Sequence, residues 1–199
     1  MNTKARLLLF SLLAFLVAPI GSLSANDNLI PGKLIEQMRA WSSSPVVMLT
    51  LEASNKRHKD LTEPSILELD KQWRAERKVE DQPLITAVLA SPLSSYLTAI
   101  QASSLGLYTE IFVMDNKGLN AGQSAITSDF WQGDEAKFQK TFPNGPTAVF
   151  IDEPEVNKDS GTENVQVNMS ISDGTNAVGT LTVEVNLTEL RRRQAAGKL

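Results

Sequence analysis

The sequence predicts a single domain of the α+β class, with helices in its first half and an antiparallel sheet in its second half. Up to about residue 104, apolar residues recur every three to four positions, which is the period of an amphipathic helix. After Gly106 they alternate with polar residues, which is the period of a strand with one buried face. Helix and strand patterns do not alternate along the chain, so a parallel α/β sheet is not expected. We therefore expect about five antiparallel strands, with long N-terminal helices packed on one side of the sheet.

Five helices are expected before the strands begin. Leu34, Met38 and Trp41 recur at the helical spacing and share one face of the first helix. Prolines and hydroxyl side chains at the expected starts favour a first helical turn. The residue before Pro83 is disfavoured in a helix, so the third helix should end ahead of it. The expected helices span residues 32–42, 45–59, 62–81, 84–89 and 92–104.

The second half should form five strands joined by tight turns. The first two make a hairpin around the turn at residues 115–118. The last two alternate most regularly and meet at a turn around Gly174, with aliphatic residues on one face and polar residues on the other. One face of the sheet should therefore be buried, and the other should be wet or line a pocket. The expected strands span residues 111–114, 119–124, 147–156, 165–171 and 181–187.

The N-terminus has the pattern of a secretory signal. Lys4 and Arg6 precede an apolar stretch, Leu7–Val17, which is too short to cross a bilayer comfortably. Small residues follow it, and we expect cleavage after Ser24 or Ala25. An uncleaved membrane anchor is the alternative. In either case the domain that follows should lie in the periplasm.

One domain should remain after export, over residues 26–190, followed by a basic tail at 191–199 that we expect to be frayed. Loss of residues 1–25 takes the net charge from −4 to −6, because this segment holds two basic residues and no acidic one. A nucleic-acid-binding role is not expected of so acidic a domain. The chain has no cysteine, which excludes disulfides, thiolate catalysis and cysteine metal sites. The apolar core must therefore supply the stability.

A candidate binding segment lies between the expected strands. Residues 127–139, TSDFWQGDEAKFQ, are predicted to form a short amphipathic helix at the mouth of the sheet. Its rings offer flat apolar surface and its polar side chains offer hydrogen bonds, a mixture typical of small-molecule pockets. The alternative, that each ring simply covers the sheet, has equal weight. With two weaker candidates at the sheet edge included, the predicted ligand-binding residues are Asp129, Phe130, Trp131, Gln132, Lys137, Tyr108 and Asp152.

Enzymatic chemistry is not expected. His58 is the only histidine, and in the basic run at residues 56–59 its expected role is that of a solvated helix end. No nucleophile motif accompanies it, so no catalytic residue and no cofactor are predicted. Acidic residues gather between positions 152 and 163, but their spacing departs from that of a calcium-binding loop. We expect a solvated acidic turn there, and no metal site.

Three stretches resemble the extracytoplasmic PAS-like sensor domains called Cache or PDC domains. They are EIFVMDNKG at 110–118, TSDFWQGDE at 127–135 and GTLTVEVNL at 179–187, within a likeness that covers roughly residues 33–190. The resemblance implies a five-stranded antiparallel sheet with a long helix behind it. It also implies a pocket between sheet and loops for amino acids, carboxylates or amines, lined by residues 129–131.

The expected function is that of a stand-alone periplasmic sensor module, which binds a small polar ligand without transforming it and presents it to a membrane receptor or kinase. Trp131 and Phe130 would form a flat wall. Asp129 would pair with a ligand amine, and Gln132 or Lys137 would hold a carboxylate. The alternative is an interaction or assembly module without a small ligand, including a homodimer formed through the N-terminal helix.

Overall fold

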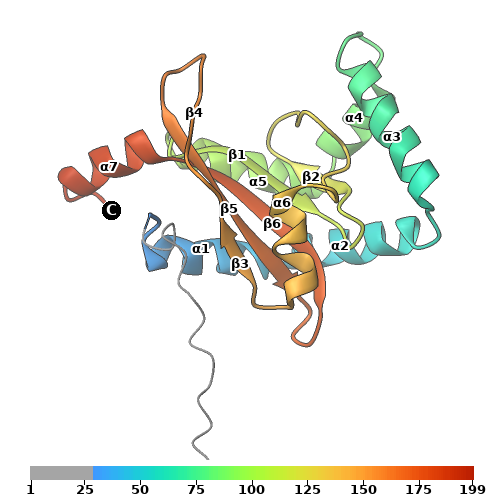
Figure 1. Ribbon diagram of the computed structural model, residues 1–199, viewed down its shortest axis with the longest axis horizontal. Coiled ribbons are helices and arrows are strands. Elements are labelled where there is room, and N and C mark those ends of the chain that lie inside the picture. Colours follow the sequence, from blue (N-terminus) through green and yellow to red (C-terminus); the bar gives the residue numbers. More distant parts are fainter. Residues whose placement is uncertain (1–28) are drawn as a thin grey trace, which may run out of the picture.

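The computed structural model describes residues 29–199 (Figure 1). The export signal expected at residues 1–25 lies outside the described residues. Five helices come first, as predicted: α1 (Gly32–Ser42), α2 (Pro45–His58), α3 (Glu63–Glu76), α4 (Pro83–Leu89) and α5 (Pro92–Ser103). They are followed by β1 (Tyr108–Met114), β2 (Asn120–Gln123), α6 (Ala136–Gln139), the 3-10 helix η2 (Phe142–Asn144), β3 (Val149–Ile151), β4 (Glu155–Val156), β5 (Glu163–Ser172), β6 (Ala177–Asn186) and α7 (Leu187–Ala195).

The strands form one antiparallel sheet in the order β2-β1-β6-β5-β3, with β4 also paired to β5. β5 and β6 are its longest strands and lie side by side, with Val167 opposite Val183. β1 pairs with the other edge of β6, with Val113 opposite Leu181. The predicted α+β class with an antiparallel sheet and N-terminal helices is therefore confirmed.

Helices α1, α2 and α5 pack against one face of this sheet and form the main core (Figure 1). Met38, Leu51 and Leu93 project from these helices with 0% exposure. They join Val167 and Val183 of the sheet in one apolar cluster. The alternation of β5 and β6 follows from this burial, because every second side chain of a strand points to the same face. Each such aliphatic side chain contributes about 1.5–3 kcal/mol when it is buried.

The opposite face of the sheet is covered as well, by α6 and η2. Phe138 and Phe142 stack with ring centroids 5.1 Å apart, and Phe112 of β1 packs in the same cluster. Polar residues share this buried face: the hydroxyl of Thr182 donates to Oδ1 of Asn168 at 2.8 Å, and both residues have 0% exposure. The face that we expected to be wet or pocket-lining is thus largely closed by α6, at the end of the candidate segment, and by η2, which follows it.

Three local expectations are wrong. Only α6 is helical within residues 127–139, because the residues before it hydrogen-bond to distant parts of the chain and not to one another. The strand expected over 147–156 is split into β3 and β4, and Pro154, which has no N–H to donate, lies in the break. The third helix ends at Glu76, before the expected end at Asp81.

The C-terminal segment is also ordered differently from the expectation, because it forms α7 instead of a frayed tail. Asn186 begins this helix, and its side-chain oxygen accepts a hydrogen bond from the backbone N–H of Glu189 at 2.9 Å. The Glu189 carboxylate in turn accepts hydrogen bonds from Arg192 and Arg193, which lower the pKa of Glu189 to about 2. These pairs use the basic side chains that the sequence assigned to a tail.

Between Leu29 and Leu199, no single helix has the length and apolar character that a membrane crossing requires. Helices α4 and α5 meet that requirement only as a pair, and they are bent by 66° relative to each other.

Candidate functional site

The end of α2 and the turn between β1 and β2 meet at a buried polar cluster. Nδ1 of His58 donates to Oδ2 of Asp115 at 2.5 Å, and the two side chains are 10% and 0% exposed. The hydroxyl of Ser54, one helical turn earlier, donates to the same oxygen at 3.0 Å. The other carboxylate oxygen accepts the backbone N–H groups of Lys117 and Leu119, at 2.9 and 3.1 Å. Asp115 therefore fixes the turn and fastens it to α2 at the same time.

A second buried carboxylate holds the segment that follows the hairpin. Oδ1 of Asp70, on α3, accepts the backbone N–H groups of Phe130 and Trp131 at 2.9 and 3.1 Å. The indole N–H of Trp73, also on α3, donates to the carbonyl of Thr127 at 3.0 Å. The rings of Trp73 and Phe130 stack 5.3 Å apart. This segment is consequently shaped by α3 and not by a helix of its own.

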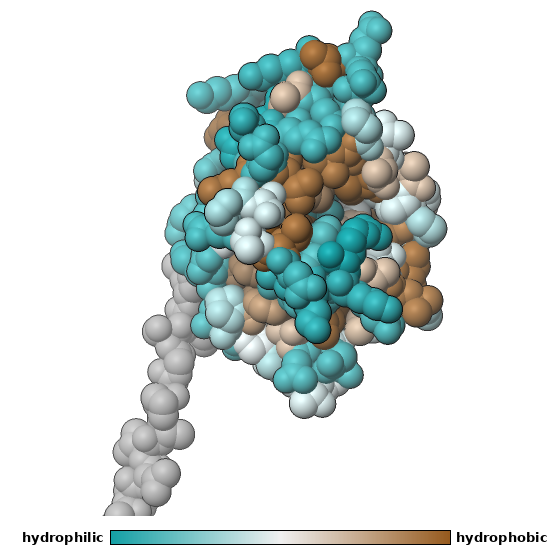
Figure 2. Space-filling model, turned by 90° about the vertical axis from the view of Figure 1, so that its right-hand side faces the viewer, coloured by the Kyte–Doolittle hydropathy of each residue, from teal (hydrophilic) through white to brown (hydrophobic). Residues whose placement is uncertain are grey.

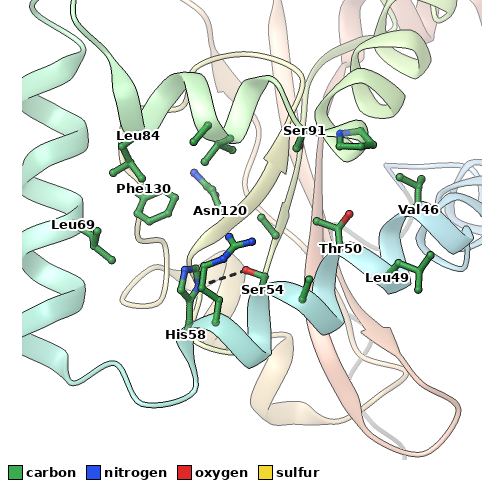
Figure 3. Close-up of a pocket in the computed structure, with 16 residues that line it drawn as sticks. Val46, Leu49, Thr50, Ser54, His58, Leu69, Leu84, Ser91, Asn120 and Phe130 are labelled. Carbon is green, nitrogen blue, oxygen red and sulfur yellow. Dashed lines mark hydrogen bonds between the residues drawn. The ribbon is translucent and has the colours of Figure 1, made fainter.

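Between these two clusters lies a cavity of about 950 Å³, which we call the α2–α4 cavity (Figure 3). One face of α2 forms its floor, and α4 and β2 form the opposite wall. Figure 2 looks onto this side of the molecule, where apolar residues gather in a band between polar surfaces. The large apolar side chains that line the cavity are Val46, Leu49, Leu69, Leu84, Val88 and Phe130.

A few polar side chains interrupt this apolar lining. Ser54, Arg57 and His58 reach it from α2, and Asn120 reaches it from β2. The amide nitrogen of Asn120 donates to the hydroxyl of Thr127 at 2.8 Å, and also to a backbone carbonyl of the same segment. Its amide oxygen is buried and accepts no hydrogen bond from any residue between 29 and 199. A mostly apolar cavity with a small number of converging polar groups is the usual form of a small-molecule site.

Phe130 is the one candidate from the predicted binding segment that lines this cavity. Asp129 is paired with Arg74 of α3 at 2.9 Å. The indole N–H of Trp131 donates to the carbonyl of Lys117 at 2.8 Å, which places this ring against the β1–β2 turn. Gln132 is buried, and its amide donates to the carbonyl of Asp129 at 2.8 Å. These three residues therefore support the wall that carries Phe130.

Lys137 and Asp152 lie elsewhere, at a smaller cavity of about 270 Å³ beside α6 and β5. Five of its ten lining residues are acidic, and Lys137 forms an ion pair with Glu135 at 2.8 Å. Close to it, Glu110 of β1 lies opposite Glu184 of β6. Burial, and then the neighbouring charge of Glu184, raises the pKa of Glu110 to about 7, while Lys137 acts in the opposite direction.

Tyr108, the remaining predicted residue, borders a third cavity of about 620 Å³ next to α1. Its hydroxyl donates to Oε1 of Gln37 at 3.2 Å, and its ring meets that of Trp41 edge-on. Burial raises the pKa of Tyr108 to about 12, so its hydroxyl stays protonated at neutral pH. The seven predicted residues thus belong to three separate places in the fold.

Residues that the sequence did not single out hold the α2–α4 cavity together. The expectation of a solvated His58 is wrong, since the residue is 8% exposed and bonded to Asp115. A signal for this was present: Leu51, Ser54 and His58 recur at helical spacing and form one buried row of α2. The basic neighbours of the histidine obscured that signal. No pattern indicated Asp70, which is far in sequence from the amides that it holds.

The Ser54, His58 and Asp115 side chains do not have the arrangement of a hydrolytic triad. In such a triad the serine bonds to one ring nitrogen of the histidine and the carboxylate bonds to the other. Here Ser54 and His58 both bond to the same carboxylate oxygen, and the serine hydroxyl lies 3.4 Å from the nitrogen already engaged there. Among residues 29–199, no group of three or more acidic or histidine side chains is placed to hold a metal ion.

No protein-family model and no curated protein sequence matches this chain. Solved structures do resemble it. The extracellular domain assigned to a histidine kinase, vpHK1S-Z8, has a TM-score of 0.43 and 11% identity, over 80% of this chain and 51% of its own. The ligand-binding domain of the Campylobacter jejuni chemoreceptor Tlp3 with 4-methylisoleucine has a TM-score of 0.39 and 13% identity, over 77% of this chain and 65% of its own.

A third similar structure is the ligand-binding domain of the Pseudomonas aeruginosa PAO1 amino acid chemoreceptor PctC, in complex with GABA. Its TM-score is 0.35 and its identity 12%, over 79% of this chain and 63% of its own. The chain thus spans about half to two thirds of the length of these structures. They are extracellular sensor domains of histidine kinases and chemoreceptors, the class that the sequence was found to resemble. Likeness at this level identifies no ligand and no binding residue in this chain.

Proposed function

We propose that this domain binds a small molecule in the α2–α4 cavity, as a periplasmic sensor module that presents its bound ligand to a membrane receptor or kinase. The observation that carries the proposal is the cavity itself. Its volume of about 950 Å³ lies near the upper end of the range for drug-sized ligands. Its lining combines large apolar side chains with Ser54, His58 and Asn120. Such a lining offers apolar contact over most of a ligand and hydrogen bonds at a few points.

The walls of the cavity are held in place before a ligand arrives. His58 and the β1–β2 turn share Asp115, and the Phe130 segment is held by Asp70. A site whose walls are already fixed loses less conformational entropy on binding, which favours affinity.

The residues predicted from the sequence take different parts in this proposal. Phe130 forms part of the cavity wall, and Asp129, Trp131 and Gln132 act through the segment that positions it. Lys137 borders the acidic cavity near α6, where Asp152 also lies, and Tyr108 borders the cavity next to α1. The alternative of a dimer through α1 has less support, because Leu34 and Met38 pack into the core with 6% and 0% exposure.

A thermal-shift screen of amino acids, amines and organic acids against the purified protein tests the proposal. A ligand present at about 100 times its dissociation constant stabilises the folded state by about 2.7 kcal/mol, so the shift is easily measured. The decisive variant is Ala53→Trp, which places a large ring on the cavity side of α2 at an exposed position. At least one compound should raise the melting temperature of the wild type and leave that of Ala53→Trp unchanged.

The matched control is Ala99→Trp, on the exposed surface of α5 and away from the cavity. This variant should respond to the ligand as the wild type does. If no compound stabilises the wild type, or if Ala53→Trp responds as strongly as Ala99→Trp, the α2–α4 cavity is not a ligand site.

A further inference from the structure

The charged side chains of the α2–α4 cavity indicate which chemical class of ligand it accepts. Within residues 29–199, the charged or titratable groups that line the cavity are Arg57 and His58, and no acidic side chain lines it. Asp115 stands behind His58 with 0% exposure, and its two oxygens already accept four hydrogen bonds. The cavity therefore presents positive charge and no compensating carboxylate.

Arg57 differs from every other arginine between residues 29 and 199, because it makes no hydrogen bond and no ion pair there. Arg39 and Arg77 donate to backbone carbonyls. Arg74 pairs with Asp70, and the three arginines of α7 pair with acidic side chains. A basic residue near the end of α2 is favoured by the helix dipole, which accounts for its charge. The dipole does not account for a guanidinium that borders an apolar cavity without a partner.

A guanidinium next to an apolar cavity suits one kind of ligand end in particular. Its planar array of donors matches the two oxygens of a carboxylate, which it can hold with paired, charge-assisted hydrogen bonds. His58 presents its second nitrogen, Nε2, which makes no hydrogen bond within the described chain. Because Nδ1 donates to Asp115, Nε2 is an acceptor in the neutral ring, so the hydrogen bonds to a carboxylate come from Arg57. Beyond these groups the walls are made by Leu69, Leu84, Val88 and Phe130, which favour a hydrocarbon body.

We infer that the α2–α4 cavity takes an amphipathic monocarboxylate, with its carboxylate at Arg57 and its aliphatic or aromatic body along the apolar walls. This inference rests on the proposed function and narrows the class of ligand. The sequence led us to expect a small polar ligand bound near Asp129, whereas the cavity favours an apolar body with a carboxylate at Arg57. Arg57 then acts as the specificity-determining residue of the cavity, and the apolar lining supplies most of the contact area.

Isothermal titration with matched probes tests this inference. Octanoate and phenylacetate carry the carboxylate and an apolar body, octylamine and 1-octanol carry the body with a cationic or neutral head, and acetate carries the head alone. Octanoate and phenylacetate should bind. Octylamine and 1-octanol lack the charge-assisted pair and acetate lacks the apolar contact, so each should bind at least about tenfold more weakly.

The variant Arg57→Gln should weaken octanoate binding by about tenfold or more and should leave the weak binding of 1-octanol unchanged. Lys56→Gln is the control: its side chain is the exposed neighbour on α2, it does not line the cavity, and it should bind octanoate as the wild type does. Both variants alter exposed residues, so unfolding is not expected to interfere.

The outcomes separate the two proposals. If octylamine or another uncharged or cationic compound binds best, and Ala53→Trp abolishes that binding, the ligand site stands and the carboxylate inference falls. If octanoate binds with the same affinity to Arg57→Gln and to Lys56→Gln, the assignment of Arg57 falls. If none of these probes and no compound of the thermal-shift screen binds, both proposals fall together.

Discussion

The core beneath α1 and α5 and the framework around the α2–α4 cavity are both buried, but they are held together in different ways. In the core, aliphatic side chains such as Leu51, Leu93 and Val183 share a large number of equivalent contacts. Around the cavity, a few carboxylate oxygens hold several chain segments at once, at Asp70 and Asp115. Apolar contacts are non-directional and tolerate small changes of shape, whereas a buried polar group left without its partner is costly.

The difference suggests a division of roles within the fold. The core fixes the sheet and the helices that cross it. The framework keeps α3 and α4 apart from α2 and leaves room between them for a ligand. The hydrogen bonds to Asp70 and Asp115 fix the positions of the segments that form the cavity walls.

The largest expected effect tests the framework at its centre. Asp115→Ala removes the acceptor of four hydrogen bonds and leaves His58 and two backbone N–H groups buried without a partner. We expect the free energy of unfolding to fall by about 3–5 kcal/mol, the range found when one partner of a buried pair is removed. Urea denaturation of wild type and variant measures the loss.

The control for this experiment is Asp173→Ala, at the exposed turn between β5 and β6. Asp173 also accepts two backbone N–H groups of its own turn, but it lies in solvent. Little change in stability is expected there. Equal losses at Asp115 and Asp173 would show that the turn geometry matters and that the link to α2 does not.

Sequence patterns could predict the core but not the framework. Leu51 and Val183 belong to regular periods, and such a period depends only on which face of a helix or strand is buried. The hydrogen bond between His58 and Asp115 joins residues 57 positions apart, and that of Asp70 to Phe130 spans 60. A single sequence contains no pattern that relates one residue of such a pair to the other.

The candidate site was predictable to the same limited degree. Aromatic residues beside hydrogen-bonding ones drew attention to the segment around Phe130, and Phe130 lines the α2–α4 cavity. The floor of the site comes from α2, whose buried row ends at His58 and whose next face carries Arg57. His58 and Arg57 approach Phe130 only in the folded protein, so local spacing in the sequence could not show that they line the same cavity.

The second prediction concerns the buried carboxyl group of Glu110, outside the framework. Its pKa in the folded protein is about 7, raised from 4.5 chiefly by burial. Because the folded state holds this proton more tightly than the unfolded chain, the free energy of unfolding should fall as pH rises from about 4.5 to about 7. The loss is at most roughly 3.5 kcal/mol, from about 1.4 kcal/mol for each pKa unit.

The variant Glu110→Gln should remove this fall and be the more stable protein at pH 8, as measured by urea midpoints at pH 5 and pH 8. Glu189→Gln serves as control, since a carboxylate with a pKa of about 2 is ionised in both states throughout this pH range. An equal dependence on pH in the wild type and in Glu110→Gln would show that burial does not affect this carboxyl group.

The third prediction concerns the other carboxylate of the framework. Asp70→Ala leaves the N–H groups of Phe130 and Trp131 without their acceptor, and a loss of about 2 kcal/mol is expected. Hydrogen exchange at these two amides should accelerate more than exchange in β5. Glu68→Ala, on the exposed side of the same helix, should cost less than about 0.5 kcal/mol. Similar losses in both variants would mean that the segment is held by packing alone.

The smallest effect separates a ring that packs from a ring that also donates a hydrogen bond. Trp131→Phe keeps an aromatic ring and removes the indole N–H that donates to the carbonyl of Lys117, at a cost of about 1 kcal/mol. Trp41→Phe is the matched control, because Trp41 meets Tyr108 edge-on and its indole N–H makes no hydrogen bond within residues 29–199.

Ligand titration of Trp131→Phe and of Phe130→Leu completes this comparison. Trp131 lies behind the cavity wall that Phe130 forms, so Trp131→Phe should lower ligand affinity less than Phe130→Leu does. An affinity that falls equally in both variants would place the indole in the binding site itself. In that case the ligand would contact both Trp131 and Phe130, as the sequence predicted. The framework would then have moved to admit the ligand between these two rings.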